Sequence, residues 1–221
     1  MYDTLIRNFK IAANLFDPKK VEEIFKENMK NASTKTGLIL FFMSGIITLI
    51  FGLLSSLEVS YILNYYQEIA SQAIEGAAAL SIESAVFLAI VDLFIWIPFF
   101  VIFIFIYEKI IYHVFKAIGG KGSFEQQYYA SSLVSLALGF TTTLSLVVPI
   151  PCFNLIALVA MLALTVYFSL FVNVKAYEIV HGIPFLHCFI VSLLFIIPKT
   201  IVLTLAPEMI ISFLGIGPEV I

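Results

Sequence analysis

Two charged residues, Asp92 and Lys199, lie inside long apolar stretches of the sequence. If these stretches cross a bilayer, each charge is about seven residues from the same predicted side, roughly 10 Å at the helical rise. A lone charge at such a depth is costly, so opposite charges at one depth predict an ion pair. The pair is a candidate ion or proton site for a small ion or solute transporter or channel. Two structural alternatives stay open: a clamp between two helices, and a Lys199 side chain that extends outward to the headgroups.

Two prolines, Pro98 and Pro198, interrupt the same two stretches. Each lacks a backbone donor, so the carbonyl one turn earlier, at Phe94 or Leu194, loses its helical partner. Kinked helices beside a buried ion pair could form a gate. The commoner role is to shape helix packing, because neighbouring helices satisfy the freed groups.

Small residues recur at every fourth position in the middle of the chain, at Ser131, Ser135, Gly139 and Thr143. This pattern allows helices to approach closely in lipid, so it predicts the helix at the packing centre of a bundle. A self-association face is the alternative. Upstream, Ser123 and Gln126 have the spacing of a capping box and predict the start of this helix.

Residues for catalysis or metal binding are sparse. No nucleophile is accompanied by a recognisable base and orienting acid, so we expect no enzymatic activity and no cofactor. Glu178 and His181 have the Glu-x-x-His spacing of di-iron bundles, but the chain has no second copy of that motif. We expect no metal. The alternative is a site formed by Glu108, His113 and His181 near the cytoplasmic face, where solvated interface residues are the simpler interpretation.

Composition indicates the class of protein that holds these residues. The chain has 221 residues, of which 61% are hydrophobic and 12% charged, against about 45–50% and about 25% in soluble domains. The apolar residues form five blocks of about 20 residues, the length that crosses hydrocarbon. We therefore predict an all-α, polytopic transmembrane helical bundle with spans at about 37–57, 85–107, 128–148, 153–174 and 185–206.

The connections complete this prediction. Residues 1–36 are expected to form a cytoplasmic amphipathic segment, 37–206 the transmembrane domain, and 207–221 an external tail. The long connection 58–84 is expected to carry an interfacial helix on the outer side. Residues 149–152 are expected to join spans 3 and 4 in a tight hairpin, and residues 119–123 to form a flexible turn, because they lack the spacing of a phosphate loop.

Basic residues predict the orientation. Eleven of the twelve Lys and Arg residues fall in segments that five spans would place on one side, and none falls in the segments on the other side. The twelfth is Lys199. Because basic residues stay with the cytoplasm, the amino terminus is predicted inside and the carboxyl terminus outside.

The amino-terminal segment predicts two short helices. Their apolar faces comprise Leu5, Ile6, Phe9, Ala12, Ala13 and Phe16 in the first, and Val21, Ile24, Phe25, Asn28, Met29 and Ala32 in the second. Such helices can lie among lipid headgroups. They can equally be ordinary helices that pack on the cytoplasmic loops.

Three segments together resemble the prokaryotic branch of the Yip (Ypt/Rab-interacting protein) family of five-span membrane proteins. They are Gly119-Gly120-Lys121-Gly122-Ser123-Phe124-Glu125, Tyr129-Ala130-Ser131, and Lys175-Ala176-Tyr177-Glu178-Ile179-Val180-His181-Gly182. The resemblance implies a helical bundle with a cytoplasmic amino terminus and a role in shaping or sorting membranes. The family's Asp-Leu-x-Gly-Pro motif is missing, because Asp92-Leu93 lacks the following Gly-Pro, and this argues against binding of a small GTPase.

The leading functional hypothesis is a non-catalytic integral membrane protein of this Yip-like type, which organises lipid or binds membrane partners. The expected partners are the lipid bilayer, further copies of the chain or other membrane proteins. Nucleic acid is not expected, because eleven of the twelve basic residues are lysines, whereas nucleic-acid surfaces favour arginine.

Overall fold

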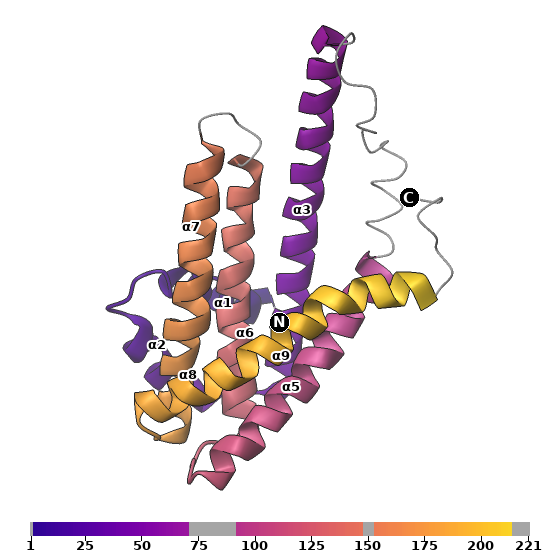
Figure 1. Ribbon diagram of the computed structural model, residues 1–221. Helices are drawn as coiled ribbons and strands as arrows, with labels where there is room; N and C mark the ends of the chain where they lie inside the picture. The colour runs from indigo at the N-terminus through magenta and orange to yellow at the C-terminus, as the bar shows by residue number, and fades with distance from the viewer. Residues whose placement is uncertain (1, 71–91, 148–152, 214–221) are drawn as a thin grey trace.

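The computed structural model describes residues 2–70, 92–147 and 153–213, without the side chains of residues 2, 56–70, 92–93, 154, 204 and 206–213. Over this part of the chain the structure consists of helices and contains no strand (Figure 1). The helices are α1 (Tyr2–Asn14), α2 (Val21–Asn28), η1 (Met29–Asn31), α3 (Thr34–Ala70), η2 (Asp92–Trp96), α5 (Ile97–Ala117), α6 (Phe124–Thr141), η3 (Thr142–Val147), α7 (Asn154–Val166), η4 (Tyr167–Val172), α8 (Asn173–His181) and α9 (Phe185–Phe213).

Within the described residues, five stretches are long and apolar enough to cross a membrane, which confirms the predicted fold class. They are Thr34–Ser55, Phe94–Ala117, Phe124–Val147, Leu155–His181 and Phe185–Leu203. The second was predicted to begin at 85, but residues 85–91 lie outside the described part of the chain. The fourth extends seven residues beyond its predicted end at 174, because η4 and α8 continue α7 without a break.

Helix α3 is longer than the sequence analysis predicted. It runs for 37 residues to Ala70, so residues 58–70 continue the same helix beyond the apolar stretch that ends at Ser55, and the predicted break in the helix after residue 57 is wrong. Between 53 and 70 the sequence contains neither glycine nor proline, the residues that most often end a helix. Residues 71–84 of the predicted connection lie outside the described chain.

Helix α6 lies at the centre of the bundle and packs most extensively against α3, with which it runs parallel. Ser44 of α3 donates to the carbonyl of Ser135 at 2.8 Å, and about three turns further along α3 Ser55 donates to the carbonyl of Ser145 at 3.0 Å. The two helices come close because small residues line the contact. Towards their first turns, a methyl group added to Gly37 would lie 2.7 Å from the ring of Tyr128.

The end of α6 tightens into the 3₁₀ segment η3. Thr142, Thr143 and Ser145 each donate the side-chain hydroxyl to the carbonyl three residues earlier, at 2.6–2.8 Å. Such local bonds compete with the regular helical pattern and favour a tighter turn. Helix α7 returns beside η3, as a hairpin requires (Figure 1), although the predicted connection 149–152 lies outside the described residues.

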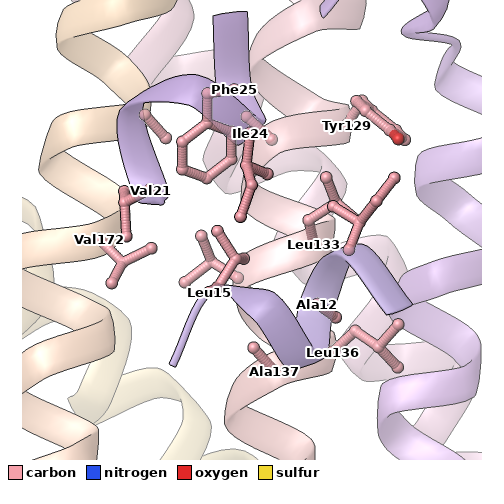
Figure 2. Close-up of a cluster of buried hydrophobic side chains, with 14 of the residues drawn as sticks. Ala12, Leu15, Val21, Ile24, Phe25, Tyr129, Leu133, Leu136, Ala137 and Val172 are labelled. Atoms are coloured by element: carbon pink, nitrogen blue, oxygen red, sulfur yellow. The ribbon is translucent and has the colours of Figure 1, made fainter. Parts of the chain in front are cut away.

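The amino-terminal helices pack on the bundle. Figure 2 shows Leu15, Val21 and Phe25 among side chains of α6 and η4, including Leu133 and Val172. All five are at most 1% exposed. The amino-terminal helices thus pack on protein, but against the long apolar helices and not against the cytoplasmic loops, as the second alternative expected.

The buried face of α1 differs from the predicted one. Ile6 and Phe16 are each 38% exposed and Ala13 is also exposed, whereas Asn8 and Ile11 are buried. Asn8 faces the bundle because the Tyr129 hydroxyl donates to its Oδ1 at 2.6 Å. The predicted face of α1 is confirmed at Ala12, which is buried, and at Phe9, which packs against the core, but it is wrong at Ile6 and Ala13; for α2 the predicted face from Val21 to Met29 is the buried one.

A charged link also fastens α2 to the bundle. Lys175 of α8 contacts Glu22 of α2 at 3.3 Å and Glu178 of its own helix at 2.9 Å. Hydrogen bonds from Lys26 and then Lys175 lower the pKa of the Glu22 carboxyl below its ordinary value. Glu22 is therefore ionised, and able to hold Lys175, over the whole physiological pH range.

Candidate functional site

A cluster of buried polar side chains joins three helices at the end of the bundle where α5 and α8 finish. Glu108 comes from α5, Gln127 and Ser131 from α6, and Tyr177 and His181 from α8. Glu108 is 2% exposed, and Gln127, Tyr177 and His181 are completely buried. Residues four apart lie on one face of a helix, so Gln127 with Ser131 and Tyr177 with His181 point into the same space.

Glu108 is the acceptor at the centre of this cluster. The Tyr177 hydroxyl donates to Oε1 at 2.9 Å, and the Gln127 amide donates to Oε2 at 2.7 Å. The same amide also donates to the Glu108 backbone carbonyl at 2.9 Å. Each carboxyl oxygen therefore has a donor from a different helix, which meets the requirement that a buried carboxyl be hydrogen-bonded.

The remaining members hold these donors in position. Gln127 Oε1 lies 2.8 Å from His181 Nε2, and because the Gln127 amide nitrogen faces Glu108, His181 must donate from Nε2. Ser131 Oγ donates to the Tyr177 hydroxyl at 3.3 Å. Protons in the cluster thus point towards Glu108 from both α6 and α8, so the cluster acts as a polar clamp on three helices.

The glycine-rich turn 119–123 closes this end of the cluster. The backbone amide of Lys121 donates to the His181 carbonyl at 2.9 Å, and the His181 ring stacks on Phe115 at 4.7 Å between centroids. A methyl group added to Gly120 would lie 2.8 Å from His181 Nδ1, and one added to Gly122 would clash with the Val180 carbonyl. The prediction of a flexible turn is wrong, because these two glycines allow the turn to pack directly on α8.

The predicted ion pair is only partly within the described structure. The Asp92 side chain lies outside it, so pairing with Lys199 stays a prediction. Lys199 is partly buried in α9, and its Nζ lies 5.1 Å from the centre of the Tyr107 ring on α5. This is a cation–π distance. The aromatic partner, Tyr107, directly precedes Glu108 in the sequence of α5.

The two prolines occupy different settings. Pro98 lies in the first turn of α5, directly after the π-helical segment η2. A π-helical turn widens the backbone, which fits the loss of one helical donor at proline. Pro198 lies within α9, which continues as a helix to Phe213.

The four small residues of α6 separate into different contacts. Ser135 and Gly139 face Ser44 of α3, with Ser135 Oγ 3.1 Å from Ser44 Oγ. Ser131 belongs to the polar clamp, and Thr143 donates to its own helix at Phe140. The middle of this face of α6, at Ser135 and Gly139, is therefore covered by α3 of the same chain.

The segments that carry the family resemblance come together at the clamp. The 119–123 turn packs on Val180 and His181, and Ser123 forms the predicted capping box with Gln126. Tyr129 fastens α1, Glu178 accepts from Lys175, and Gly182 ends α8 in the left-handed conformation at φ 65°. Residues far apart in the sequence thus build one structural unit.

The interpretation of Glu108 and His181 as solvated interface residues is wrong, since both are buried, whereas His113 is exposed. A metal site from these three is not formed, because Gln127 lies between Glu108 and His181. Over the described residues no group of three or more His, Cys, Asp or Glu side chains could hold a metal ion.

Sequence reasoning missed Gln127 and the role of Tyr177. A signal was present in α5, where Val101, Ile104, Glu108, Ile111 and Phe115 repeat at steps of three and four, and all are buried. A charged residue on such a stripe points inward. The i,i+4 polar pairs on the two partner helices supply its donors.

Comparisons with known proteins give no family assignment. No family model, curated protein or solved structure matches the chain. Its five apolar helices are compatible with a multi-pass membrane protein.

Proposed function

We propose that this chain is a multi-pass protein of the cell membrane, with its amino terminus in the cytoplasm, that acts as a non-catalytic scaffold for lipid or membrane partners. The observation that carries this proposal is the internal use of Glu108. Both of its carboxyl oxygens accept hydrogen bonds from neighbouring helices. A carboxyl committed in this way stabilises the bundle and is not poised to receive a substrate or an ion.

The docked amino terminus supports the same proposal. Hydrogen bonds from Tyr129 to Asn8 and from Tyr167 to the Leu15 carbonyl attach α1 to the bundle. The predicted cytoplasmic side is thus one packed surface, suited to present a fixed shape to other membrane components. The Yip-like motifs contribute to this surface, which is consistent with the trafficking or membrane-organising role that the resemblance implies.

Transport is the second candidate, and the position of Lys199 favours it. Its Nζ lies beside Tyr107, next in sequence to the buried Glu108. An ammonium and two acids within the predicted spans could bind an ion or relay a proton. The predicted Asp92–Lys199 pair would then be the site of transport.

Reconstitution into vesicles separates the two functions. If the protein is a scaffold, proton and ion flux into vesicles that contain it should equal the flux into empty vesicles. The Asp92→Asn and Lys199→Met variants should then leave this flux unchanged. Flux that disappears in Asp92→Asn would establish transport instead.

Association is tested directly with two differently tagged copies expressed in one membrane. Purification through one tag should recover the other copy or a defined membrane protein in a fixed ratio. Membranes mixed only after solubilisation provide the control for chance association in detergent. Material that is always monomeric and free of partners would contradict the scaffold.

A further inference from the structure

A cavity of about 630 Å³ lies between α3, α6, α7 and the start of α5. Its volume is within the range of about 300–1,000 Å³ that is typical of small-molecule sites. Ser44 and Ser135 line one end, Leu53 lies towards the other, and Trp96 and Met161 lie on the sides. The cavity lies apart from the polar clamp and has no function in the scaffold proposed above.

The lining of the cavity carries no charged or ionisable side chain. It does include six hydroxyls, of which four donate to backbone carbonyls of the protein. Ser44 donates to the Ser135 carbonyl, Thr142 to Gly139 and Thr165 to Met161, all at 2.6–2.8 Å. Thr141 likewise donates to Leu138 at 2.7 Å. These hydroxyls have no proton left for a ligand, so the cavity presents a largely apolar surface.

The cavity also lies at the depth of hydrocarbon. Ser44 is ten residues and Leu53 nineteen residues into α3, which places them about 15 and 28 Å along the helix. A bilayer has a hydrocarbon core about 30 Å thick, so the whole cavity falls within it if α3 starts at the interface. Neighbouring surfaces are apolar too, since Leu158 and Leu162 of α7 are 52% and 65% exposed.

The cavity has room because small residues of α3, including Ser44, Gly45 and Gly52, line it. A methyl group added to Gly52 would meet no atom within 4 Å, whereas one added to Gly45, nearer the first end, would lie 3.2 Å from Ile97. Gly52 therefore leaves open space within a helix, where glycine is otherwise unfavourable by about 0.5–1 kcal/mol relative to alanine.

We propose that this cavity binds one acyl chain of a bilayer lipid. Water is disfavoured, because four of the six lining hydroxyls already donate to backbone carbonyls and few polar groups remain to hold it. Ions are disfavoured, because no lining group carries charge. An aliphatic chain from the surrounding bilayer matches the depth, the volume and the apolar surface.

The single tryptophan of the chain is a built-in probe, since Trp96 lines the cavity. The protein is reconstituted in phosphatidylcholine vesicles in which part of the lipid carries brominated acyl chains, which quench nearby tryptophan. Bromolipid should quench Trp96 strongly, and the water-soluble quencher acrylamide should have little effect.

Gly52→Leu is the decisive variant, because Gly52 lines the cavity and even a methyl group added there meets no atom within 4 Å, so the larger side chain should occupy part of the cavity. It should lose much of the bromolipid quenching while keeping its circular dichroism and melting temperature. Ile50→Phe is the matched control: Ile50 is 48% exposed and does not line the cavity, so added bulk there should leave quenching unchanged.

Three results would overturn the proposal. Weak quenching by bromolipid would show that no acyl chain reaches Trp96. Strong quenching by acrylamide would show a water-filled cavity. Unchanged bromolipid quenching in a folded Gly52→Leu protein would show that the quenching lipid lies outside the cavity. None of these results bears on flux or association, so the scaffold is tested separately.

Discussion

At the scale of the residue, the balance of donors and acceptors around Glu108 decides how the bundle tolerates a carboxyl in its interior. Gln127 and Tyr177 supply the donors, and His181 and Ser131 orient them. An acid that is left without donors in an apolar interior costs several kcal/mol, and donors left without the acid are penalised in the same way. The clamp is therefore stable only as a complete set.

Removal of the acid should destabilise the bundle more than neutralisation does. Glu108→Ala leaves two buried donors unpaired, each costing about 1–3 kcal/mol, and adds a void. Glu108→Gln keeps the shape and one acceptor, so it should lower the free energy of unfolding by a smaller amount. Melting temperatures in detergent measure both variants, and equal melting temperatures for Glu108→Ala and the natural protein would contradict the clamp.

The partner hydroxyl provides an independent check. Tyr177→Phe removes one donor to Glu108 and should reduce stability by about 1–3 kcal/mol. Combined with Glu108→Gln, the two losses should not add, because residues in one network couple by about 0.5–3 kcal/mol. A double-mutant cycle by chemical unfolding gives this coupling, and strict additivity would mean that the two side chains do not interact.

At the scale of the element, two packed features fix how helices meet: the 119–123 turn on α8 and the amino-terminal helices on α6, η4 and α8. Both rely on close approach of backbone or apolar side chains. Within the described part of the chain, no disulfide bond holds either feature in place. Each should therefore respond to small local changes.

Gly122→Ala should separate the turn from α8. The added methyl group meets the Val180 carbonyl, and overpacking of this kind costs about 1–3 kcal/mol. Hydrogen exchange of the Lys121 amide, which donates to His181, should accelerate. Gly52→Ala is the control, because its methyl group meets nothing within 4 Å and should leave that exchange unchanged.

The link between α2 and α8 should weaken at low pH. The pKa of Glu22 is lowered in the folded chain, so its contribution is present above the unfolded value of about 4.3 and is lost as pH falls through the lowered folded value. Proteolysis of the amino-terminal segment should therefore increase below about pH 4. The exposed neighbour Glu23 has no recorded ion pair in the described chain, so Glu23→Gln should keep this pH response, whereas Glu22→Gln should abolish it.

The sequence predicted these elements unevenly, for physical reasons. The number of spans follows from the lengths of the hydrophobic stretches, and the capping box at Ser123 is a pattern of neighbouring residues. Both could therefore be predicted from the sequence. Tyr177 and Gln127 were not, because a hydrogen bond between helices depends on their rotation and register. The inward position of Asn8 on α1 was missed for a related reason, since it depends on a hydrogen bond from Tyr129 of another helix.

At the scale of the whole molecule, the described connections before α3 and between α5 and α6 lie at the same end of the bundle as the end of α8. The 119–123 turn lies against the end of α8 through the bond from Lys121 to His181. The start of α3 lies at the same end, because Gly37 packs on Tyr128 near the start of α6. This end also holds Lys35, Lys116 and Lys121, three of the residues that predict the cytoplasmic side.

Reporter fusions test this orientation. With five spans and basic residues retained in the cytoplasm, a reporter before Met1 should be active only inside the cell and a reporter after Ile221 only outside. A cysteine introduced at exposed Lys121 should resist a membrane-impermeant thiol reagent in intact cells and react after permeabilisation. The predicted asymmetry arises because Lys35, Lys116 and Lys121 all lie at the end of the bundle that holds the clamp. Reporters at both termini on one side would therefore contradict the topology and the packing that depends on it.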